Sequence, residues 1–223
     1  MPTTLIERDV VPVSVFVRNK VINSERFTQV ALIVTLLGVW EVAGRRMGTF
    51  FLAPPSSLAA AFQEMAVSGE LLDAVLDSLA SLGAGFGIAV AVGVALGFLM
   101  GWYDPVGRIL NPFVSALYVI PTAALVPLFI VWFGLGFLAR TITVLLFCVF
   151  EMIISTYTGV RNVDPLLVDA AKAFGANRRQ LFMKVVTIAS LPYIFAGLRM
   201  GASRAIKGMV VAELLFALSL IHI

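Results

Sequence analysis

The sequence is poor in the residues that most enzymes and metal sites use. It has one cysteine, Cys148, and one histidine, His222, in 223 residues. A single cysteine forms no internal disulfide, and its place in an apolar run favours the role of a small buried hydrophobic side chain. His222 stands next to the end of the chain, which argues against histidine catalysis and histidine metal clusters. We therefore predict no catalytic residue and no metal ligand.

Charge is also scarce. Only 13% of the residues are charged, whereas 60% are hydrophobic, and a soluble domain is nearer a quarter charged and half apolar. A chain of this length could not bury so much apolar surface in a soluble core, so we predict an integral membrane protein. The net charge of +3 is spread between apolar runs and forms no basic domain, so we expect no nucleic-acid partner. The first 26 residues contain no signal-peptide pattern.

A phosphate-binding loop is missing as well. The pattern G-x-x-x-x-G-K-[ST] does not occur, and the nearest stretch, residues 201–207, lacks the glycine before the lysine. The chain therefore does not hydrolyse ATP by that route, and we expect that it binds no cofactor of its own.

Long apolar runs are abundant and predict an all-α polytopic fold. After a polar tail over residues 1–26, about five runs are long enough to span a bilayer: 27–43, 71–100, 113–133, 138–157 and 193–216. Between the first two, Pro54-Pro55 and Ser56-Ser57 predict a turn followed by a serine-capped helix. This helix either lies in the membrane interface or simply connects two spans.

The second predicted span carries small residues on one face. Gly93, Gly97 and Gly101 repeat every four residues, and small residues at this spacing let helix backbones approach closely in lipid. The third contains Pro121 and Pro127, which remove helical hydrogen bonds and predict kinks. The freed carbonyls need partners, so such breaks face protein or a cavity.

Ionisable residues stand in two of the apolar runs. Glu151 lies in the fourth, and Arg199, Arg204 and Lys207 lie in the fifth. Such residues are costly in lipid, so we expect them to face other helices, water or an anionic partner. For Glu151 the alternatives are a functional or buried, partnered position and a position near the cytoplasmic interface.

The polar stretch over residues 161–192 separates the last two spans. If the N-terminus is cytoplasmic, ten Lys and Arg residues fall on the inner side and three on the outer side. The positive-inside rule therefore favours a cytoplasmic N-terminus and a cytoplasmic 161–187 loop, although the Arg45-Arg46 pair violates it locally.

This loop resembles the EAA loop of ABC importer permeases, the membrane subunits of binding-protein-dependent uptake systems. The residues that carry the resemblance are Val163-Asp164-Pro165, Leu167 to Ala171 and Gly175 to Arg178. Further blocks from Phe51 to Leu215 are similar to the nitrate/sulfonate/taurine branch, in this order: 51–56, 120–121, 125–127, 132–136, 191–194, 197–199 and 211–213.

The resemblance implies a MetI-like permease bundle over residues 71–217, in a bacterial or archaeal cytoplasmic membrane. It implies that the loop enters a cleft on a separate ATPase subunit, which would hold ATP and Mg. We expect a binding protein outside the membrane and a second permease copy as further partners. The residues that would form the ATPase-coupling loop are Asp169, Ala170, Ala171, Gly175, Arg178 and Pro192.

The same reading suggests a translocation path for a small solute, sulfonate-, nitrate- or taurine-like or vitamin-precursor-like. The residues expected along the path are Pro121, Thr122, Glu151, Arg199 and Arg204, although the break at Pro121 could instead be a purely structural kink. The alternative class is a secondary transporter or channel that needs no ATPase, but the sequence shows no internal repeat of the kind such proteins often have.

The chain departs from the family pattern in three places. Asp169 stands where the family has glutamate, and the family's additional leucine-proline is Thr187-Ile188 here. The family also has one more span after the position of Glu213. The last residues, 218–223, match a translated transposon-end adapter used in sequencing libraries, so we expect a non-native end and a lost sixth span.

Overall fold

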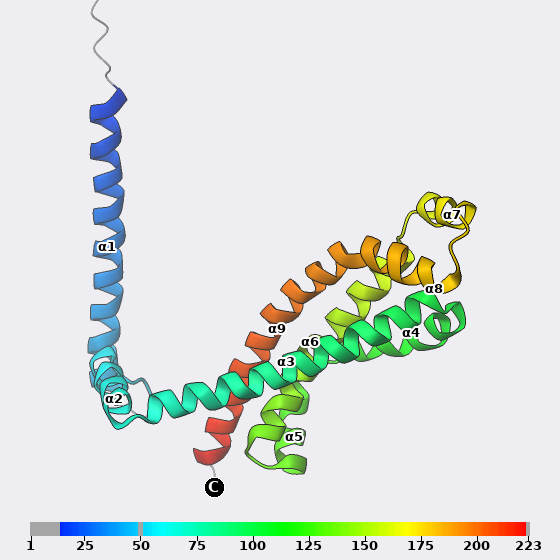
Figure 1. Ribbon diagram of the computed structural model, residues 1–223. Helices are drawn as coiled ribbons and strands as arrows, with labels where there is room; N and C mark the ends of the chain where they lie inside the picture. The colour runs from blue at the N-terminus through cyan, green and yellow to red at the C-terminus, as the bar shows by residue number, and fades with distance from the viewer. Residues whose placement is uncertain (1–13, 49–50, 222–223) are drawn as a thin grey trace, which may run out of the picture. The chain divides into compact units, whose positions relative to one another are not determined.

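The computed structural model describes residues 14–48 and 51–221 (Figure 1). These residues form helices and short connections, with no strand among them. Four helices of the described residues are long and apolar enough to cross a membrane, and a fifth span is present if one bent helix pair is counted as one. The predicted all-α membrane fold with about five spans is confirmed. Residues 1–13 of the predicted tail, and His222 and Ile223 of the predicted non-native end, lie outside the described residues.

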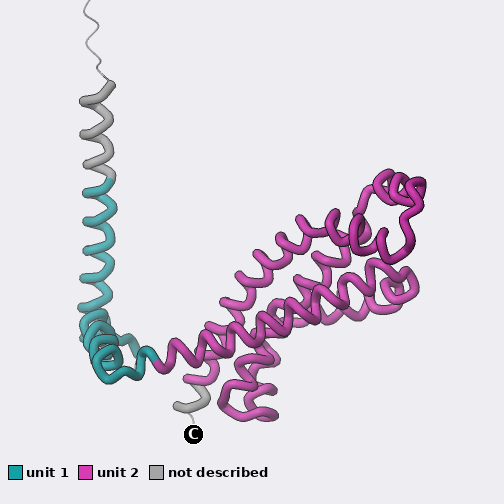
Figure 2. The backbone as a smooth tube through the Cα atoms, in the orientation of Figure 1, with its two compact units in different colours: residues 1–72 teal, residues 73–223 magenta. Residues whose placement is uncertain are grey.

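The chain forms two compact units, Met1–Leu72 and Asp73–Ile223 (Figure 2). Unit 1 contains helix α1, Ser14–Met47, and helix α2, Pro55–Ser68. The first predicted span lies within α1. The predicted serine cap of α2 is wrong, because Pro54 is the N-cap residue and its side chain accepts no hydrogen bond from the first turn. Proline suits this end, where backbone N–H groups lack helical partners.

In unit 2, helix α3, Glu70–Trp102, lies close against helix α6, Phe137–Arg161. The predicted glycine face makes this contact. A Cβ atom at Gly93 would lie 2.4 Å from the Cβ of Met152, and one at Gly97 would lie 2.5 Å from the Cβ of Thr156. The two backbones can approach this closely only because the α3 face has no side chains there.

Helix α6 lies at the centre of the unit. Half of its most apolar stretch is buried, a larger share than in any other candidate span of the described chain. Its side chains join two apolar clusters, one with α3, α4 and α9 and one with α5 and α9. Cys148 belongs to the first cluster and is fully buried, which confirms its predicted role as a small buried side chain.

The third predicted span is broken into two helices. Helix α4 covers Asp104–Val119, a 3₁₀ turn covers Thr122–Leu125, and helix α5 covers Val126–Phe133. The two parts are bent by 79°, so a break at Pro121 is confirmed. The predicted start at residue 113 is wrong, because α4 begins nine residues earlier with Pro105 in its first turn and Pro112 inside the helix. Pro127 lies in the first turn of α5 and causes no kink.

A tight turn links α5 to α6, and Gly134 adopts a φ of 74° there. After α6 the chain forms helix α7, Pro165–Ala173, and a short helix α8, Arg178–Gln180. A π-helix over Leu181–Val186 then leads without a loop into helix α9, Thr187–Ile221.

Pro192 lies inside α9, so the prediction that the fifth span begins after this proline is wrong. The helix instead runs on from Arg178. Hydroxyl groups bond to carbonyls in this region: Thr187 Oγ1 donates to the Phe182 carbonyl at 2.9 Å and Ser190 Oγ donates to the Val186 carbonyl at 2.8 Å. Hydroxyls and π-segments of this kind help a membrane helix to accommodate a proline.

Candidate functional site

A short excursion, residues 165–180, connects the two helices that pack most closely in unit 2, α6 and α9. Its first helix, α7, is capped by Asp164, whose side chain accepts a hydrogen bond from the Leu166 N–H at 2.8 Å, and Pro165 occupies the first turn. Asp169, one of the expected coupling residues, does not begin this helix. The structure places it in the second turn, paired with Lys172 at 3.4 Å. The Asp-Pro dipeptide was the signal for the true cap.

Helix α7 ends at a glycine turn. Gly175 has a φ of 79°, its N–H donates to the Lys172 carbonyl at 2.9 Å, and the Ala176 N–H donates to the Ala171 carbonyl at 3.0 Å. This pair of bonds is a Schellman motif. A Cβ at Gly175 would meet nothing within 4 Å. Glycine is therefore needed at this position for the backbone conformation and not for space.

The turn passes directly into a second capped helix. Asn177 Oδ1 accepts from the Gln180 N–H at 2.9 Å, and Gln180 Oε1 accepts from the Asn177 N–H at 2.9 Å. This reciprocal capping box starts α8. The excursion is thus held by its own hydrogen bonds at both of its helix starts and at the glycine turn, so its shape needs no partner.

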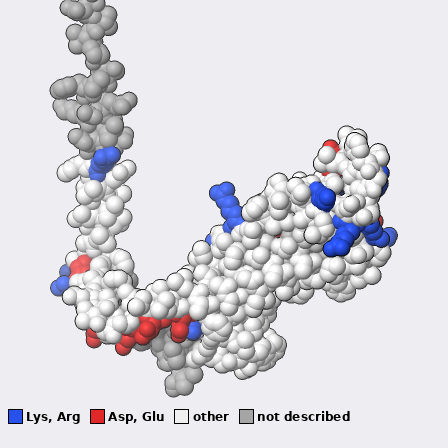
Figure 3. All heavy atoms as spheres, viewed as in Figure 1, with Lys and Arg blue, Asp and Glu red and all other residues white. Residues whose placement is uncertain are grey.

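The surface of the excursion is apolar where a soluble loop would be polar. Phe174 is 93% exposed and Leu166 is 75% exposed, and Ala170 beside them is exposed as well. Figure 3 shows that Lys and Arg side chains gather at the end of unit 2 that carries α7 and α8. Exposed large apolar side chains next to polar ones mark a surface for a protein partner.

The structure brings most of the predicted coupling residues together. Asp169, Ala170 and Ala171 lie on α7, Gly175 forms the turn, and Arg178 begins α8. Pro192 does not belong to this group, because it lies inside α9, about 18 Å of helix beyond Gln180.

A second candidate site is an ion pair inside the bundle. Glu151 of α6 is 5% exposed, and its carboxylate lies 2.5 Å from Arg204 Nε of α9. The Tyr118 hydroxyl of α4 donates to Glu151 at 3.0 Å and accepts from Arg204 Nη2 at 2.6 Å. The guanidinium also lies 4.9 Å from the centre of the Tyr118 ring. Three helices thus meet in one polar cluster.

The position of this cluster favours one of the two alternatives for Glu151. Glu151 lies ten residues, or about 15 Å of helix, before Arg161 at the end of α6. It is therefore well inside the helix and has a partner, as a buried ionisable residue requires. Sequence reasoning missed Tyr118. The signal that could have found it is a hydroxyl-bearing aromatic residue in an apolar run, three residues before a proline break.

The other predicted path residues divide into two groups. Pro121 and Thr122 lie at the break that follows α4, within a turn of Tyr118. Arg199 is not part of the cluster: it is exposed, and no hydrogen bond or ion pair joins its guanidinium to any residue that the structure describes. In contrast to Arg199, Arg204 is fixed by two partners, although its side chain stays 42% exposed.

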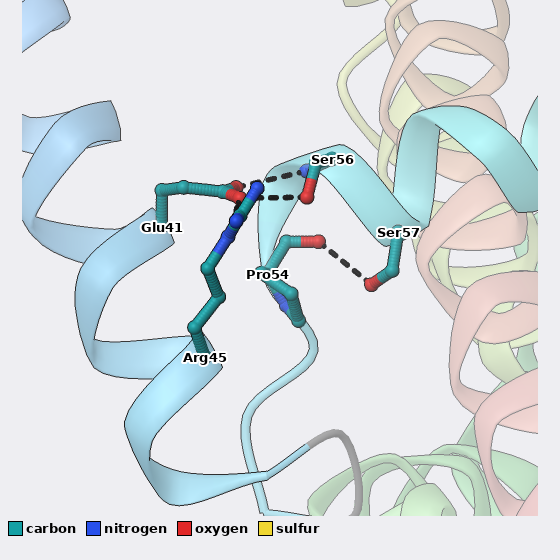
Figure 4. Close-up of polar contacts among 5 residues, drawn as sticks. All are labelled: Glu41, Arg45, Pro54, Ser56 and Ser57. Atoms are coloured by element: carbon teal, nitrogen blue, oxygen red, sulfur yellow. Dashed lines mark hydrogen bonds and ion pairs between the residues drawn. The ribbon is translucent and has the colours of Figure 1, made fainter.

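A third polar junction lies in unit 1 (Figure 4). The Glu41 carboxylate of α1 accepts hydrogen bonds from the Ser56 N–H at 3.0 Å and the Ser56 hydroxyl at 2.6 Å, and Arg45 Nε lies 2.6 Å from it. A carboxylate at the first turn of a helix is favourable because free N–H groups point toward it. Glu41 therefore supplies the hydrogen-bond acceptor at the start of α2 that the predicted serine cap does not supply.

The described residues hold no group of three or more His, Cys, Asp or Glu side chains that could bind a metal ion. What the arrangement offers is an exposed apolar excursion at one end of a helical bundle and a buried ion pair within it.

Comparison with known proteins identifies one matching family and several similar proteins. Residues 89–221 match the family described as "Binding-protein-dependent transport system inner membrane component". A protein of Methanocaldococcus jannaschii described as an ABC transporter permease is 33% identical over 201 residues, which cover 88% of this chain and 75% of the relative. An aliphatic sulfonates transport permease of Escherichia coli is 35% identical, with 82% and 71% covered. A riboflavin transport system permease protein of Chloroflexus aurantiacus is 36% identical, with 81% and 68% covered.

Proposed function

Because the chain belongs to the family of binding-protein-dependent transport system inner membrane components, we propose that it forms the translocation path of an ATP-driven importer for a small solute. It is an ABC permease with several membrane-spanning helices, in the cytoplasmic membrane of a bacterium or archaeon. A separate subunit hydrolyses ATP, and a binding protein outside the membrane delivers the solute. A second copy of the chain completes the path.

The observation that carries this proposal is the apolar surface of the excursion. Phe174 is 93% exposed at the tip of a turn that is already held by its own hydrogen bonds. A rigid, preformed surface loses little conformational entropy when a partner covers it. We propose that Phe174, Leu166 and Ala170 enter a cleft of the ATPase subunit. On this proposal the end with α7 and α8 is cytoplasmic, and the N-terminus lies on the same side because four spans separate the two.

The ion pair within the bundle supports a path beside it. The Arg204 side chain keeps 42% of its surface exposed although its carboxylate partner is buried. In a membrane such a guanidinium needs water, a polar substrate or another chain on its open side. We propose that this side, together with Pro121 and Thr122, faces the path.

The solute is proposed from the relatives. One relative is described as a permease for aliphatic sulfonates and another as a riboflavin permease. We therefore propose a small sulfonate-, nitrate- or taurine-like anion or a vitamin-precursor-like molecule.

Replacing Phe174 with serine tests the proposal. If Phe174 is buried in an ATPase cleft, its loss removes roughly 2–3 kcal/mol of apolar burial and weakens copurification of the ATPase subunit by at least about 30-fold. Val131→Ser is the matched control, because Val131 is 80% exposed on α5, away from the excursion. Unchanged copurification and ATP-dependent uptake with Phe174→Ser, or uptake by an ion gradient alone, would contradict the proposal.

A further inference from the structure

A groove of about 680 Å³ lies between the end of α3 and the start of the α8–α9 rod. Its walls include Leu99, Trp102 and Tyr103 from the α3 side, and Arg178, Arg179 and Phe182 from the other side. This volume is in the range of small-ligand sites. None of the residues that line it is acidic, so the groove is apolar in its depth and positive at one end.

Aromatic contacts give the groove a defined shape. The Phe182 ring lies edge-on to Trp102 at 5.0 Å and to Phe98 at 5.4 Å between centroids. The Arg178 guanidinium lies 5.7 Å from the Trp102 ring centre and 5.5 Å from that of Tyr103. Arg178 is thus held in place by cation–π contacts that leave its N–H donors free for an anion.

The groove opens away from the packed interior. The glycine face of α3 is turned toward α6, whereas Leu99 is 47% exposed. Trp102 is the last residue of α3 and Tyr103 follows it, which is where aromatic residues mark the boundary of a membrane. From Trp102 the apolar lining continues along α3 to Ala95, over about 10 Å into the span.

We propose that this groove binds one anionic phospholipid. The phosphate lies against Arg178 and Arg179, and the upper part of an acyl chain lies along Leu99 and Phe182. No described acidic side chain forms an ion pair with either arginine, so both charges are available. Basic pockets at the cytoplasmic ends of membrane helices favour anionic headgroups, by about fivefold for each arginine near the phosphate.

The chemistry also separates this ligand from other occupants. A free phosphate ion would use the two arginines but would leave the aromatic depth of the groove unfilled. A zwitterionic lipid would fill the depth but would bring a cation toward the arginines. Only a lipid with a net negative headgroup satisfies both parts.

Quenching of Trp102 fluorescence tests the proposal without any transport or ATPase assay, so its outcome is independent of the proposed function. The full chain with Trp40→Phe and Trp132→Phe, which keeps Trp102 as its only tryptophan, is placed in phosphatidylcholine vesicles with a minor fraction of phosphatidylglycerol. In one sample the phosphatidylglycerol carries bromine on its acyl chains. In the other, the same amount of phosphatidylcholine carries it.

We expect bromine on phosphatidylglycerol to quench at least about fivefold more effectively per lipid than bromine on phosphatidylcholine. Arg178→Gln with Arg179→Gln should abolish this preference, and the same positions replaced by lysine should retain it. Lys184→Gln is the matched control, because Lys184 is an exposed cation of the π-helix that does not line the groove.

Equal quenching by the two lipids in the parent protein overturns the proposal. The groove would then be a contact surface for a protein, either the ATPase subunit or a second copy of the chain. A preference that survives the double glutamine substitution also overturns it, because the arginines would then not select the lipid. Loss of the preference on adding excess inorganic phosphate would assign the arginines to a free anion instead.

Discussion

Breaking the Glu151–Arg204 ion pair from its two sides should have unequal effects on stability. Arg204→Gln leaves a carboxylate with a side chain that is 6% exposed and that keeps only the Tyr118 hydroxyl as partner. Glu151→Gln leaves a guanidinium that is 42% exposed and that keeps its contacts with Tyr118. Arg204→Gln therefore leaves a buried charge without its ionic partner, whereas Glu151→Gln leaves an unpaired charge that can reach the proposed path.

The magnitudes follow from this difference in burial. Removing one partner of a buried pair costs about 3 kcal/mol or more, because the remaining charge is uncompensated. Removing one partner of a charge that water reaches costs about 1 kcal/mol or less. For a chain of this size these values correspond to a fall in Tm of roughly 10 °C for Arg204→Gln and roughly 3 °C for Glu151→Gln.

The measurement is thermal unfolding of the purified variants in detergent, followed by the loss of helical circular dichroism. The double variant Glu151→Gln with Arg204→Gln should be more stable than Arg204→Gln alone by about 2 kcal/mol, because no charge is then stranded. Arg199→Gln is the matched control: it removes an exposed arginine from the same helix, and its Tm should change by less than about 2 °C.

The order of the two single variants decides the interpretation. If Glu151→Gln is as destabilising as Arg204→Gln, the open side of Arg204 is not hydrated, and the proposal that it faces the path fails. If the double variant is less stable than both single variants, the cluster is not a coupled ion pair, and the reasoning from burial fails as well.

Three further predictions concern other parts of unit 2. Gly97→Ala should destabilise the protein by about 2 kcal/mol in thermal unfolding, because the added Cβ would overlap α6. Gly87→Ala on the same helix should instead stabilise the protein by about 0.5 kcal/mol, because a Cβ there meets nothing within 4 Å. Gly175→Val should weaken copurification of the ATPase subunit by at least about fivefold, because its φ of 79° is strained for a branched side chain, while Gly175→Asn should keep most of it. Asp104→Asn removes an ion pair with Arg161 whose two side chains are half or more exposed, so its Tm should fall by less than about 4 °C. The first expectation fails if Gly97→Ala and Gly87→Ala change stability equally, and the second fails if the two Gly175 variants bind the ATPase subunit equally. A fall in Tm well above 4 °C for Asp104→Asn would contradict the third.

The contacts that depend on local periodicity were predictable from the sequence. The glycine repeat of α3 packs against α6 as expected, because a four-residue spacing of small residues defines a helix face wherever the helix lies. The positive φ of Gly175 was predictable for a similar reason, since few other residues adopt it. In both cases a single property of glycine determines the outcome.

The starts of two helices were not predictable from proline alone. A proline occurs both in the first turn of a helix and inside a membrane helix, so Pro105 and Pro112 were equally good candidates for the start of α4. Pro192 likewise lies inside α9. A preceding π-helix and hydroxyl bonds accompany it, and neither leaves a clear pattern in the sequence.

The partner of Glu151 was beyond sequence reasoning. Glu151 and Arg204 are far apart in the chain and lie on different helices, so their meeting depends on how α6 and α9 align along one another. That alignment is set by close packing at positions such as Gly197, where a Cβ would lie 2.7 Å from the Cβ of Ser155. The sequence shows two costly charges, but only the packed helices show that they meet.

The helix that begins at Arg178 has a mechanical consequence. It runs 40 residues to Ala217 without an intervening loop, a length of about 60 Å, whereas about 20 residues suffice to cross a bilayer. The glycine turn that ends α7 lies just before its first residue, and Arg204 lies about 26 residues, or about 39 Å, along it. On the proposed docking, a displacement of the excursion by the ATPase subunit would be transmitted along this helix toward Arg204. The π-helical segment and Pro192 are the two places where its regular hydrogen bonding is interrupted.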